Sequence, residues 1–289
     1  MRTIPESELI INTDGSVFHL HTRPEQLADR IVLCGDPERV STIAAYFDTK
    51  ECDVRNREFH TVTGTFKNKR ITAVSHGIGC DNIDIVVNEL DALANIDFES
   101  RTVRPVHRQL TMVRIGTSGG LQPFTPVGSY VAAEKSAGFD GVVYFYRDSY
   151  KIRDMRLEDE IVRQLDWNIE GVRPYVVSAD KRLLEQIAGD DILRGITIAA
   201  NGFYGPQGRE LRLPLSDPEL NRKIESFICD GRRITNYEME SSALAALAAL
   251  MGHRALTVCC IIAGRIDKNM NPDYKNALPA LIEKVLDRI

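Results

Sequence analysis

The segment RALTVCCIIAG, residues 254–264, indicates the fold class of this chain. Successive side chains of a β-strand point to opposite faces of the sheet, so a strand with one solvent face alternates polar and apolar residues. This segment is apolar almost throughout, which is typical of a strand that helices cover on both faces. We therefore predict that residues 254–264 form a central strand of an α/β sheet.

Other segments extend this pattern along the chain. Strands are predicted at RIVLCG (30–35), LTMVRIG (110–116), GSYVAAE (128–134), GVVYFY (141–146) and GITIAAN (195–201), and a hairpin at REFHTVTGTF (57–66) and KRITAVSHG (69–77). Helices are predicted at 81–96, with Asp81 as N-cap, and at 156–169, 238–253 and 272–289. This alternation predicts one domain over residues 1–289, with a three-layer α/β/α fold around a central mixed, mostly parallel sheet.

Composition limits the classes of partner that we expect. The 289 residues are 43% hydrophobic and carry a net charge of −5 without a long run of one sign, so no nucleic-acid partner is predicted. No apolar run is long enough to cross a bilayer and no signal-like segment is present, so we expect a cytoplasmic protein without a membrane partner. The cysteines form no C-x-x-C pair and the histidines no H-x-x-x-H pair, so neither disulfides nor a catalytic metal is expected.

Polar, glycine-rich segments follow four of the predicted strands. They are GDPERV (35–40), GTSGGL (116–121), NGFYGPQGRE (201–210) and GRIDKN (264–269). Ligands of α/β sheets gather at the carboxyl ends of the strands. These four segments are therefore predicted to form one cleft.

Three arginines near the strand ends are candidates for holding an anion. Arg39 follows Gly35, whose lack of a side chain lets a ligand approach the backbone, although Asp36 followed by proline also fits an ordinary helix start. Arg114 lies in a buried strand, where its charge needs an acidic partner or a bound anion. Because no acidic residue is close to it in sequence, we favour the anion. Together with Arg57 on the hairpin, these guanidinium groups would suit phosphate.

Two further groups would suit a sugar and a base. In NYEMES (236–241), Glu238 and Glu240 would point the same way from an extended backbone and accept hydrogen bonds from sugar hydroxyl groups. The equal alternative is a helix N-terminus, where the macrodipole favours acidic residues. The loop GFYGPQGREL (202–211) combines aromatic rings with Gln207 and Arg209, which could bind the face and the edge of a flat polar ring.

Six motifs in one order give the chain a family resemblance. GDPERV, REF, SHGIG, RIGTSGG, FYGPQGR and NYEMES occur in the order and approximate spacing of the nucleoside phosphorylases, over about residues 17 to 265. The chain resembles that family nearly throughout, which implies the α/β fold of phosphorylases and nucleosidases. Within the family, the pair Gln207 and Arg209 resembles the Gln-x-Arg pair with which uridine phosphorylases bind the uracil edge.

The resemblance also implies a role for each matching residue. It places phosphate on Gly35, Arg39, Arg57, Arg114 and Thr117; ribose on His19, Glu238, Met239 and Glu240; and the base on Ser118, Phe203, Gln207, Arg209 and Arg265. It implies that Arg57 and His19 reach in from a neighbouring subunit. The residues expected to carry the catalysis are Arg114, Gln207, Arg209 and Glu240.

The reaction implied by the resemblance is reversible phosphorolysis of uridine. Phosphate is then a co-substrate, no cofactor or metal is required, and shared sites imply a homo-oligomer, at least a dimer, with a hexamer as the alternative. Purine phosphorylases of this fold carry a Ser-Asp pair after the last core strand, where this chain has Gly264 and Arg265, with Asp267 out of register. The alternatives are a purine or broad-specificity phosphorylase, a nucleosidase, and a non-enzymatic nucleoside-binding protein.

The chain also departs from the family pattern in three places. The family's FYPGQER appears as FYGPQGR, and residues 97–110 look like a longer connection. Asn82 replaces a serine that helps to bind an interface cation, near Glu58 and Ile78, in some family members. We therefore expect no metal ion at this position.

Overall fold

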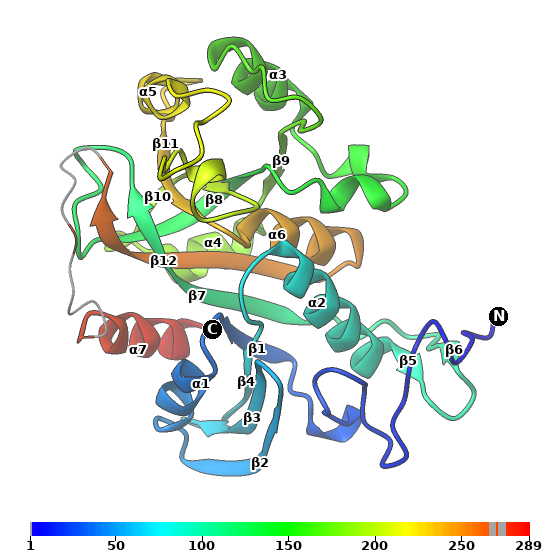
Figure 1. Ribbon diagram of the computed structural model, residues 1–289. Helices are drawn as coiled ribbons and strands as arrows, with labels where there is room; N and C mark the ends of the chain where they lie inside the picture. Colours follow the sequence, from blue (N-terminus) through cyan, green and yellow to red (C-terminus); the bar gives the residue numbers. More distant parts are fainter. Residues whose placement is uncertain (1, 266–269, 271–275) are drawn as a thin grey trace.

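The computed structural model describes residues 2–265, 270 and 276–289, and a ten-stranded sheet runs through its centre (Figure 1). The strands are β1 (Arg30–Cys34), β2 (Thr49–Asn56), β3 (Phe59–Phe66), β4 (Lys69–Ser75), β7 (Thr111–Gly120), β8 (Tyr130–Gly138), β9 (Tyr175–Ser178), β10 (Leu193–Ala199), β11 (Ile234–Glu238) and β12 (Arg254–Gly264). Their order is β11-β10-β8-β12-β7-β1-β4-β3-β2, with β9 beside β8. The strand β12 lies between β8 and β7, so the prediction of a central strand is confirmed.

The sheet is mixed. Parallel ladders join β1 to β4 and β7, β7 to β12, β8 to β10, and β10 to β11. Antiparallel ladders form the predicted β3–β4 hairpin, add β2 and β9, and join β12 to β8 and β11 to β7. The last two contacts close β7, β12, β8, β10 and β11 into a ring. The predicted, mostly parallel sheet does not include this closed ring of strands, because local sequence patterns carry no information about which strands pair.

Helices cover both faces of the sheet, which gives the predicted three layers. On one face lie α1 (Pro37–Ala44), α4 (Lys181–Ala188) and α7 (Leu278–Arg288), and on the other lie α2 (Cys80–Asn95) and α6 (Ser241–Leu250) (Figure 1). In β1, Val32 and Cys34 belong to the first core cluster, Ile31 and Leu33 to the second, and all four are fully buried. Burying a large aliphatic side chain stabilises the fold by about 1.5–3 kcal/mol, so both faces of such a strand are selected to be apolar.

The remaining elements lie around this core. A third cluster packs α3 (Met155–Gln164) and α5 (Leu220–Ser226) against β10 and β11. The small hairpin of β5 (Ile96–Asp97) and β6 (Thr102–Val103) begins directly after α2 and extends into the connection at 97–110. Four short 3₁₀ helices complete the described elements: η1 (Pro24–Gln26), η2 (Val142–Phe145), η3 (Ser149–Lys151) and η4 (Gly205–Gln207).

Within the described residues, one predicted element is absent, and several others begin or end at other residues than predicted. The segment 141–146 contains η2 instead of a strand, because Gly141 adopts φ +80° and turns the chain. The helix α2 begins at Cys80 with Gly79 as its N-cap, so Asp81 lies in the first turn. The strand predicted over 110–116 continues to Gly120, because the glycine-rich residues pair with β12.

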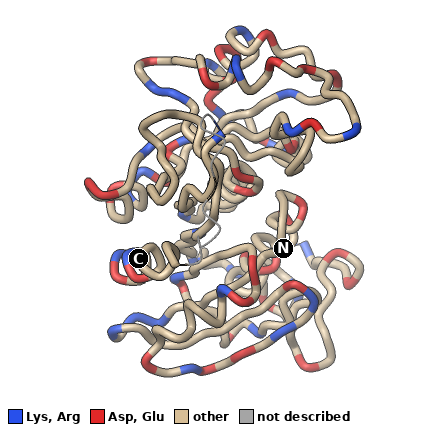
Figure 2. Tube along the Cα trace, turned by 60° about the vertical axis from the view of Figure 1, so that its left-hand side comes forward, with Lys and Arg blue, Asp and Glu red and all other residues tan. Residues whose placement is uncertain are grey.

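Surface charge and cysteine state agree with the composition. Basic and acidic residues are interspersed along the trace (Figure 2). All six cysteines are free, and four of them are buried, whereas Cys52 and Cys229 are half-buried. Within the described part of the chain, no helix has both the length and the apolar character needed to cross a bilayer.

Candidate active site

A cavity of about 910 Å³ lies where the carboxyl ends of the strands meet. Its walls come from the segment after β1, from β7, from the loop after β10, and from the ends of β11 and β12. The predicted site residues that line it are Gly35, Arg39, Arg114, Thr117, Ser118, Phe203, Gln207, Arg209, Glu238, Met239 and Glu240. Three of the four predicted segments, 35–40, 116–121 and 201–210, therefore line one cavity, whereas Gly264 and Arg265 of the fourth do not line it and residues 266–269 lie outside the described part of the chain.

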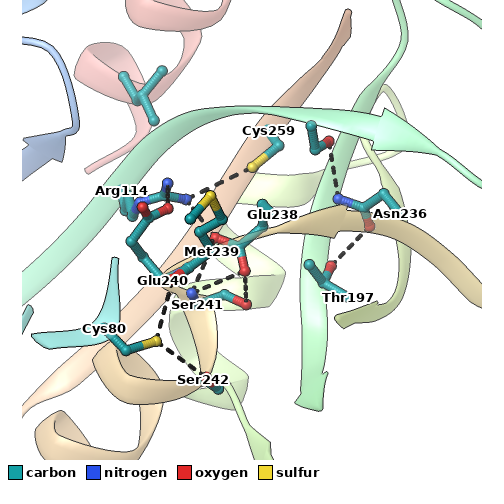
Figure 3. Close-up of polar contacts among 12 residues, drawn as sticks. Cys80, Arg114, Thr197, Asn236, Glu238, Met239, Glu240, Ser241, Ser242 and Cys259 are labelled. Carbon is teal, nitrogen blue, oxygen red and sulfur yellow. Dashed lines mark hydrogen bonds and ion pairs between the residues drawn. The ribbon is translucent and has the colours of Figure 1, made fainter. Parts of the chain in front are cut away.

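Arg114 is a buried residue in the wall of this cavity. Its side chain is 5% exposed, its Nη1 donates to Glu238 Oε2 at 2.9 Å, and its Nη2 donates to Glu240 (Figure 3). The expectation that Arg114 lacks an acidic partner is wrong, because these glutamates lie 124 and 126 residues away and reach it through the sheet. Burial lowers the pKa of Arg114, but the charges of Glu240 and Glu238 outweigh it, and the pKa lies above its ordinary value.

The two glutamates are held by a strand end and a helix start. Glu238 is the last residue of β11, and its carboxylate accepts the N–H of Glu240 at 2.9 Å, the N–H of Ser241 at 3.0 Å and the Ser241 hydroxyl at 2.6 Å. Glu240 is the N-cap of α6, and its carboxylate accepts the Gly79 N–H at 2.8 Å. Burial raises the pKa of Glu240, and the charge of Arg114 opposes this shift. The extended and the helix-start interpretations therefore each describe one of the two residues.

Two residues next to Arg114, His76 and Gly116, hold its side chain in place. In the sequence, they stand out only as members of the motifs SHGIG and RIGTSGG, without a role of their own. His76 is fully buried, and its Nε2 accepts from Arg114 Nε at 3.0 Å. Burial and the charge of Arg114 hold the pKa of His76 well below its usual range, so the neutral ring can accept this bond. At Gly116, a Cβ would lie 2.6 Å from Arg114 Nη1 and 2.8 Å from Cys259 Sγ, so only glycine leaves room for the guanidinium group.

The start of α1 contributes the candidate anion-binding groups. Asp36 is the N-cap of α1 and accepts the Glu38 N–H at 2.9 Å, so the predicted helix start is confirmed. Arg39 extends from the first turns of α1, and its Nη1 donates to the Ile115 carbonyl at 3.2 Å. Thr117 follows two residues later on β7 and lines the same cavity. The roles of these residues in phosphate binding stay predictions.

The loop after β10 contributes the candidate base-binding groups. The Cζ atom of Arg209 lies 3.8 Å from the centre of the Phe203 ring, and its Nη1 donates to Gln207 Oε1 at 2.6 Å. Gln207 is 4% exposed, and among the described residues its Nε2 has no hydrogen-bond partner. Burial and the charge of Arg265 lower the pKa of Arg209 to about 10. The loop therefore concentrates positive charge, and neither arginine pairs with a described acidic residue.

Arg265 supports this loop from outside the cavity. Its Nη2 donates to the Gln207 carbonyl, and its Cδ would lie 3.4 Å from a Cβ placed on Gly119. A second cavity of about 600 Å³ lies beside the same loop; apolar residues such as Trp167 and Leu213 line most of it, together with polar residues that include Arg209 and Asp217.

The strand β7 sets the separation between the two groups of candidate residues. Arg39 contacts β7 at Ile115, whereas Arg265 contacts it at Gly119 and donates its N–H to the Gly120 carbonyl. Four residues of extended strand span roughly 13 Å. The places where Arg39 and Arg265 contact β7 are therefore separated along the strand by roughly this length.

His19 and Arg57 lie next to each other, but neither lines the cavity. The Asn56 side chain donates to the His19 carbonyl at 2.8 Å, and the Arg57 guanidinium lies 5.7 Å from the centre of the Phe18 ring. His19 Nδ1 lies 2.6 Å from Glu89 Oε1, and Glu89 also accepts the His19 N–H at 3.0 Å. This carboxylate fixes the orientation of the imidazole ring.

One further group in the described part of the chain has the spacing of metal ligands. The candidate ligand atoms of Asp91, His107 and His253 lie within 4.8 Å of one another. His253 Nδ1 accepts the Leu110 N–H at 3.1 Å, so Nε2 carries the ring proton and donates to Asp91 Oδ1 at 3.0 Å. Ordinary hydrogen bonds thus occupy both ring nitrogens, and we assign no metal to this group.

Two predictions about the surroundings of the cavity concern Asn82 and Asp267. The Asn82 amide donates to Glu58 Oε1 at 3.4 Å. The expectation that no metal ion binds at this position stays a prediction. Asp267, the acidic residue nearest to the position used by purine phosphorylases, lies outside the described residues.

Comparisons with known proteins show which family this chain is similar to. Residues 29–286 match the Phosphorylase superfamily. A uridine phosphorylase of Thermococcus kodakarensis is 30% identical over 259 residues, which cover 88% of this chain and 79% of the relative. A DeoD-type purine nucleoside phosphorylase of Aliivibrio fischeri is 25% identical over 246 residues, which cover 84% of each chain.

A solved structure shares the whole architecture. The nucleoside phosphorylase of Trypanosoma brucei, whose crystal structure shows uridine phosphorylase activity, superposes with a TM-score of 0.88 at 28% identity and covers 97% of this chain and 98% of its own. The fold is therefore that of the nucleoside phosphorylases. Since the family match covers most of the residues and includes every strand of the cavity, the chain belongs to the phosphorylase superfamily.

Proposed function

We propose that this protein is a uridine phosphorylase, which converts uridine and phosphate reversibly to uracil and ribose 1-phosphate. The observation that carries the proposal is the pairing of Gln207 with Arg209 in the cavity that also contains Arg39, Glu238 and Glu240. This set offers donors for an oxyanion, acceptors for sugar hydroxyl groups, and an amide with a guanidinium for a pyrimidine edge. The similarity to the Thermococcus uridine phosphorylase supports the same substrate.

The charges around the cavity suit the charges that develop during phosphorolysis. As the glycosidic bond lengthens, positive charge builds on the ribose and negative charge builds on the uracil. Arg114 carries one positive charge against the two carboxylates of Glu238 and Glu240, so this cluster has an excess of negative charge for the ribose when both are ionised. Arg209 and Arg265 supply positive charge for the uracil, and hydrogen bonds that strengthen as charge develops lower the barrier.

Phosphate acts as the nucleophile and the second substrate. Arg39, Thr117 and the backbone near Gly35 would hold it against the ribose C1′, with Arg114 between phosphate and sugar. Uracil would leave as an anion that Gln207 and Arg209 stabilise, so the mechanism requires no general acid and no covalent enzyme intermediate.

We also propose that two subunits share each site. Arg57 adjoins Glu58, which lines the cavity, yet Arg57 and His19 themselves lie outside the cavity of their own chain. A symmetric dimer would bring both residues to the neighbouring site, where His19 would bind the ribose and Arg57 the phosphate.

Subunit complementation tests this arrangement. Arg57→Ala and Arg209→Ala are each expected to lose most of their activity, but each mixed dimer contains one intact site. Random mixing should restore about a quarter of the activity. Mixtures without activity would show that each chain uses its own Arg57.

The assay that tests the function measures release of uracil from uridine by the purified protein, with and without phosphate, and with inosine in parallel. We expect release only with phosphate, and no turnover of inosine. Turnover of inosine would identify a broad-specificity phosphorylase, and release without phosphate would identify a nucleosidase. Absence of turnover would refute the proposal and leave the nucleoside-binding protein as the alternative to test.

A further inference from the structure

A buried chain of polar side chains connects the sheet interior to the cavity wall. Asn236 is fully buried, and its Nδ2 donates to Ser118 Oγ at 3.0 Å. Its Oδ1 accepts from Thr197 Oγ1 at 2.9 Å, as Figure 3 shows. Ser118 is 5% exposed and lines the cavity, whereas Asn236 and Thr197 do not.

The orientation of the Asn236 amide follows from Thr197. Thr197 is 1% exposed, and among the described residues the only hydrogen-bond partner of its hydroxyl is Asn236. With the amide reversed, Nδ2 would face Thr197 and the threonine proton would have no acceptor. A buried donor without an acceptor costs about 1–3 kcal/mol, so the amide oxygen must face Thr197.

This orientation of the amide decides whether the Ser118 hydroxyl donates or accepts in its hydrogen bond with Asn236. The Asn236 amide nitrogen can only donate, so Ser118 Oγ accepts that bond and its own proton must point elsewhere. No described residue accepts the Ser118 proton. Since Ser118 lines the cavity, its hydroxyl is available to the cavity as a hydrogen-bond donor.

We propose that Asn236 is a positioning residue that makes the Ser118 hydroxyl a donor to a carbonyl oxygen of the bound pyrimidine. This inference rests on the proposed function and adds to it the direction of one hydrogen bond and the residue that sets it. Along β7, Ser118 is next to Gly119, which lies close to Arg265 behind the candidate base-binding loop, and it is three residues from Ile115, which Arg39 contacts, so its position on the strand is nearer to that loop than to Arg39. Such a bond strengthens as negative charge builds on the leaving base.

Two substitutions test whether the Ser118 hydroxyl donates a hydrogen bond into the cavity. Ser118→Ala removes the donor. Asn236→Asp keeps the shape of the side chain, but an ionised carboxylate only accepts hydrogen bonds, so the Ser118 proton would turn back toward it. Each substitution should lower kcat/KM for uridine about tenfold, mainly through kcat, and leave the KM for phosphate unchanged.

A double-mutant cycle tests whether the two residues act as one unit. Both substitutions remove the same hydrogen bond. The double variant with Ser118→Ala and Asn236→Asp should therefore be as active as the less active of the two single variants. Ser118→Thr retains a hydroxyl group and should recover most of the loss seen with Ser118→Ala. The matched control is Thr63→Val, which removes a buried hydroxyl bonded to Thr72 at 2.7 Å, away from the cavity, and should reduce stability without changing kcat/KM.

Each outcome has one meaning. Losses that add in the double variant would show that Asn236 does not act through Ser118, and a raised KM for phosphate would place the acceptor on phosphate; either result overturns the inference. Should Asn236→Asp fail to fold, calorimetric titration of Ser118→Ala and Ser118→Thr with uracil decides the point, and equal affinities would overturn it.

The failures of the two proposals are distinguishable. An active unaltered protein with an equally active Ser118→Ala variant would refute only this inference. An unaltered protein that neither cleaves uridine nor binds uracil would refute the proposed function, and the inference with it.

Discussion

Replacing Arg114 by methionine should separate the contribution of this residue to stability from its contribution to catalysis. Arg114 is 5% exposed, and its two partners, Glu238 and Glu240, are 1% and 6% exposed. Removing one member of a buried ion pair costs about 3–5 kcal/mol, because the remaining charge stays buried without compensation. Methionine occupies a similar volume, so we expect Arg114→Met to lower the free energy of unfolding by about this amount at pH 7.5.

The decrease in the free energy of unfolding of Arg114→Met should depend on pH and on Glu240. Burial raises the pKa of Glu240 above the ordinary value of 4.5, and the charge of Arg114 counteracts this shift. Without Arg114 the pKa rises further, so the folded variant binds more protons than the unfolded chain between the two pKa values. Stability of the variant therefore increases as the pH falls through the raised value. Adding Glu240→Gln, which removes one uncompensated charge, should recover part of the loss at pH 7.5.

Denaturant unfolding at equal protein concentration, together with uracil release from uridine, measures both effects. The matched control is Arg153→Met, since Arg153 forms another buried pair with the fully buried Glu158, outside the cavity. Both variants should lose comparable stability, but only Arg114→Met should lose activity, by at least about a hundredfold. A destabilisation below about 1 kcal/mol, or the same activity in both variants, would refute the reasoning.

Three further predictions concern other parts of the site. Arg209→Ala should lower kcat/KM for uridine at least about tenfold, and Arg209→Lys should recover only part of it because lysine lacks the planar fork; equal activity of Arg209→Ala and unaltered protein would remove this residue from the mechanism. Gly116→Ala should lower kcat at unchanged expression, since its Cβ would displace the Arg114 guanidinium group; a crystal structure with an unmoved guanidinium would contradict this. His19→Ala should raise the KM for uridine more than that for phosphate, and Glu89→Gln should do so to a smaller extent, because Glu89 orients the imidazole ring; titration of both substrates checks the difference.

Local patterns predicted most of the elements correctly, because the forces that they report act locally. The apolar run at 254–264 forms β12, and the helical spacing after Cys80 forms α2, since burial of a face depends on the period of the element alone. The prediction of 141–146 as a strand is wrong because apolar content does not reveal a turn at Gly141. The single-domain assignment over 1–289 and the functional roles of the site residues stay predictions.

The sequence by itself determined the types of chemical group in this protein and the strand ends that carry them. Only the tertiary structure decided which groups meet. It brings Glu238 and Glu240 to Arg114 across more than a third of the chain, and it brings Asn236 to Ser118, because β11 pairs with β7 and closes the ring. Pairing between distant strands depends on how all the strands pack together, and no short stretch of sequence contains that information.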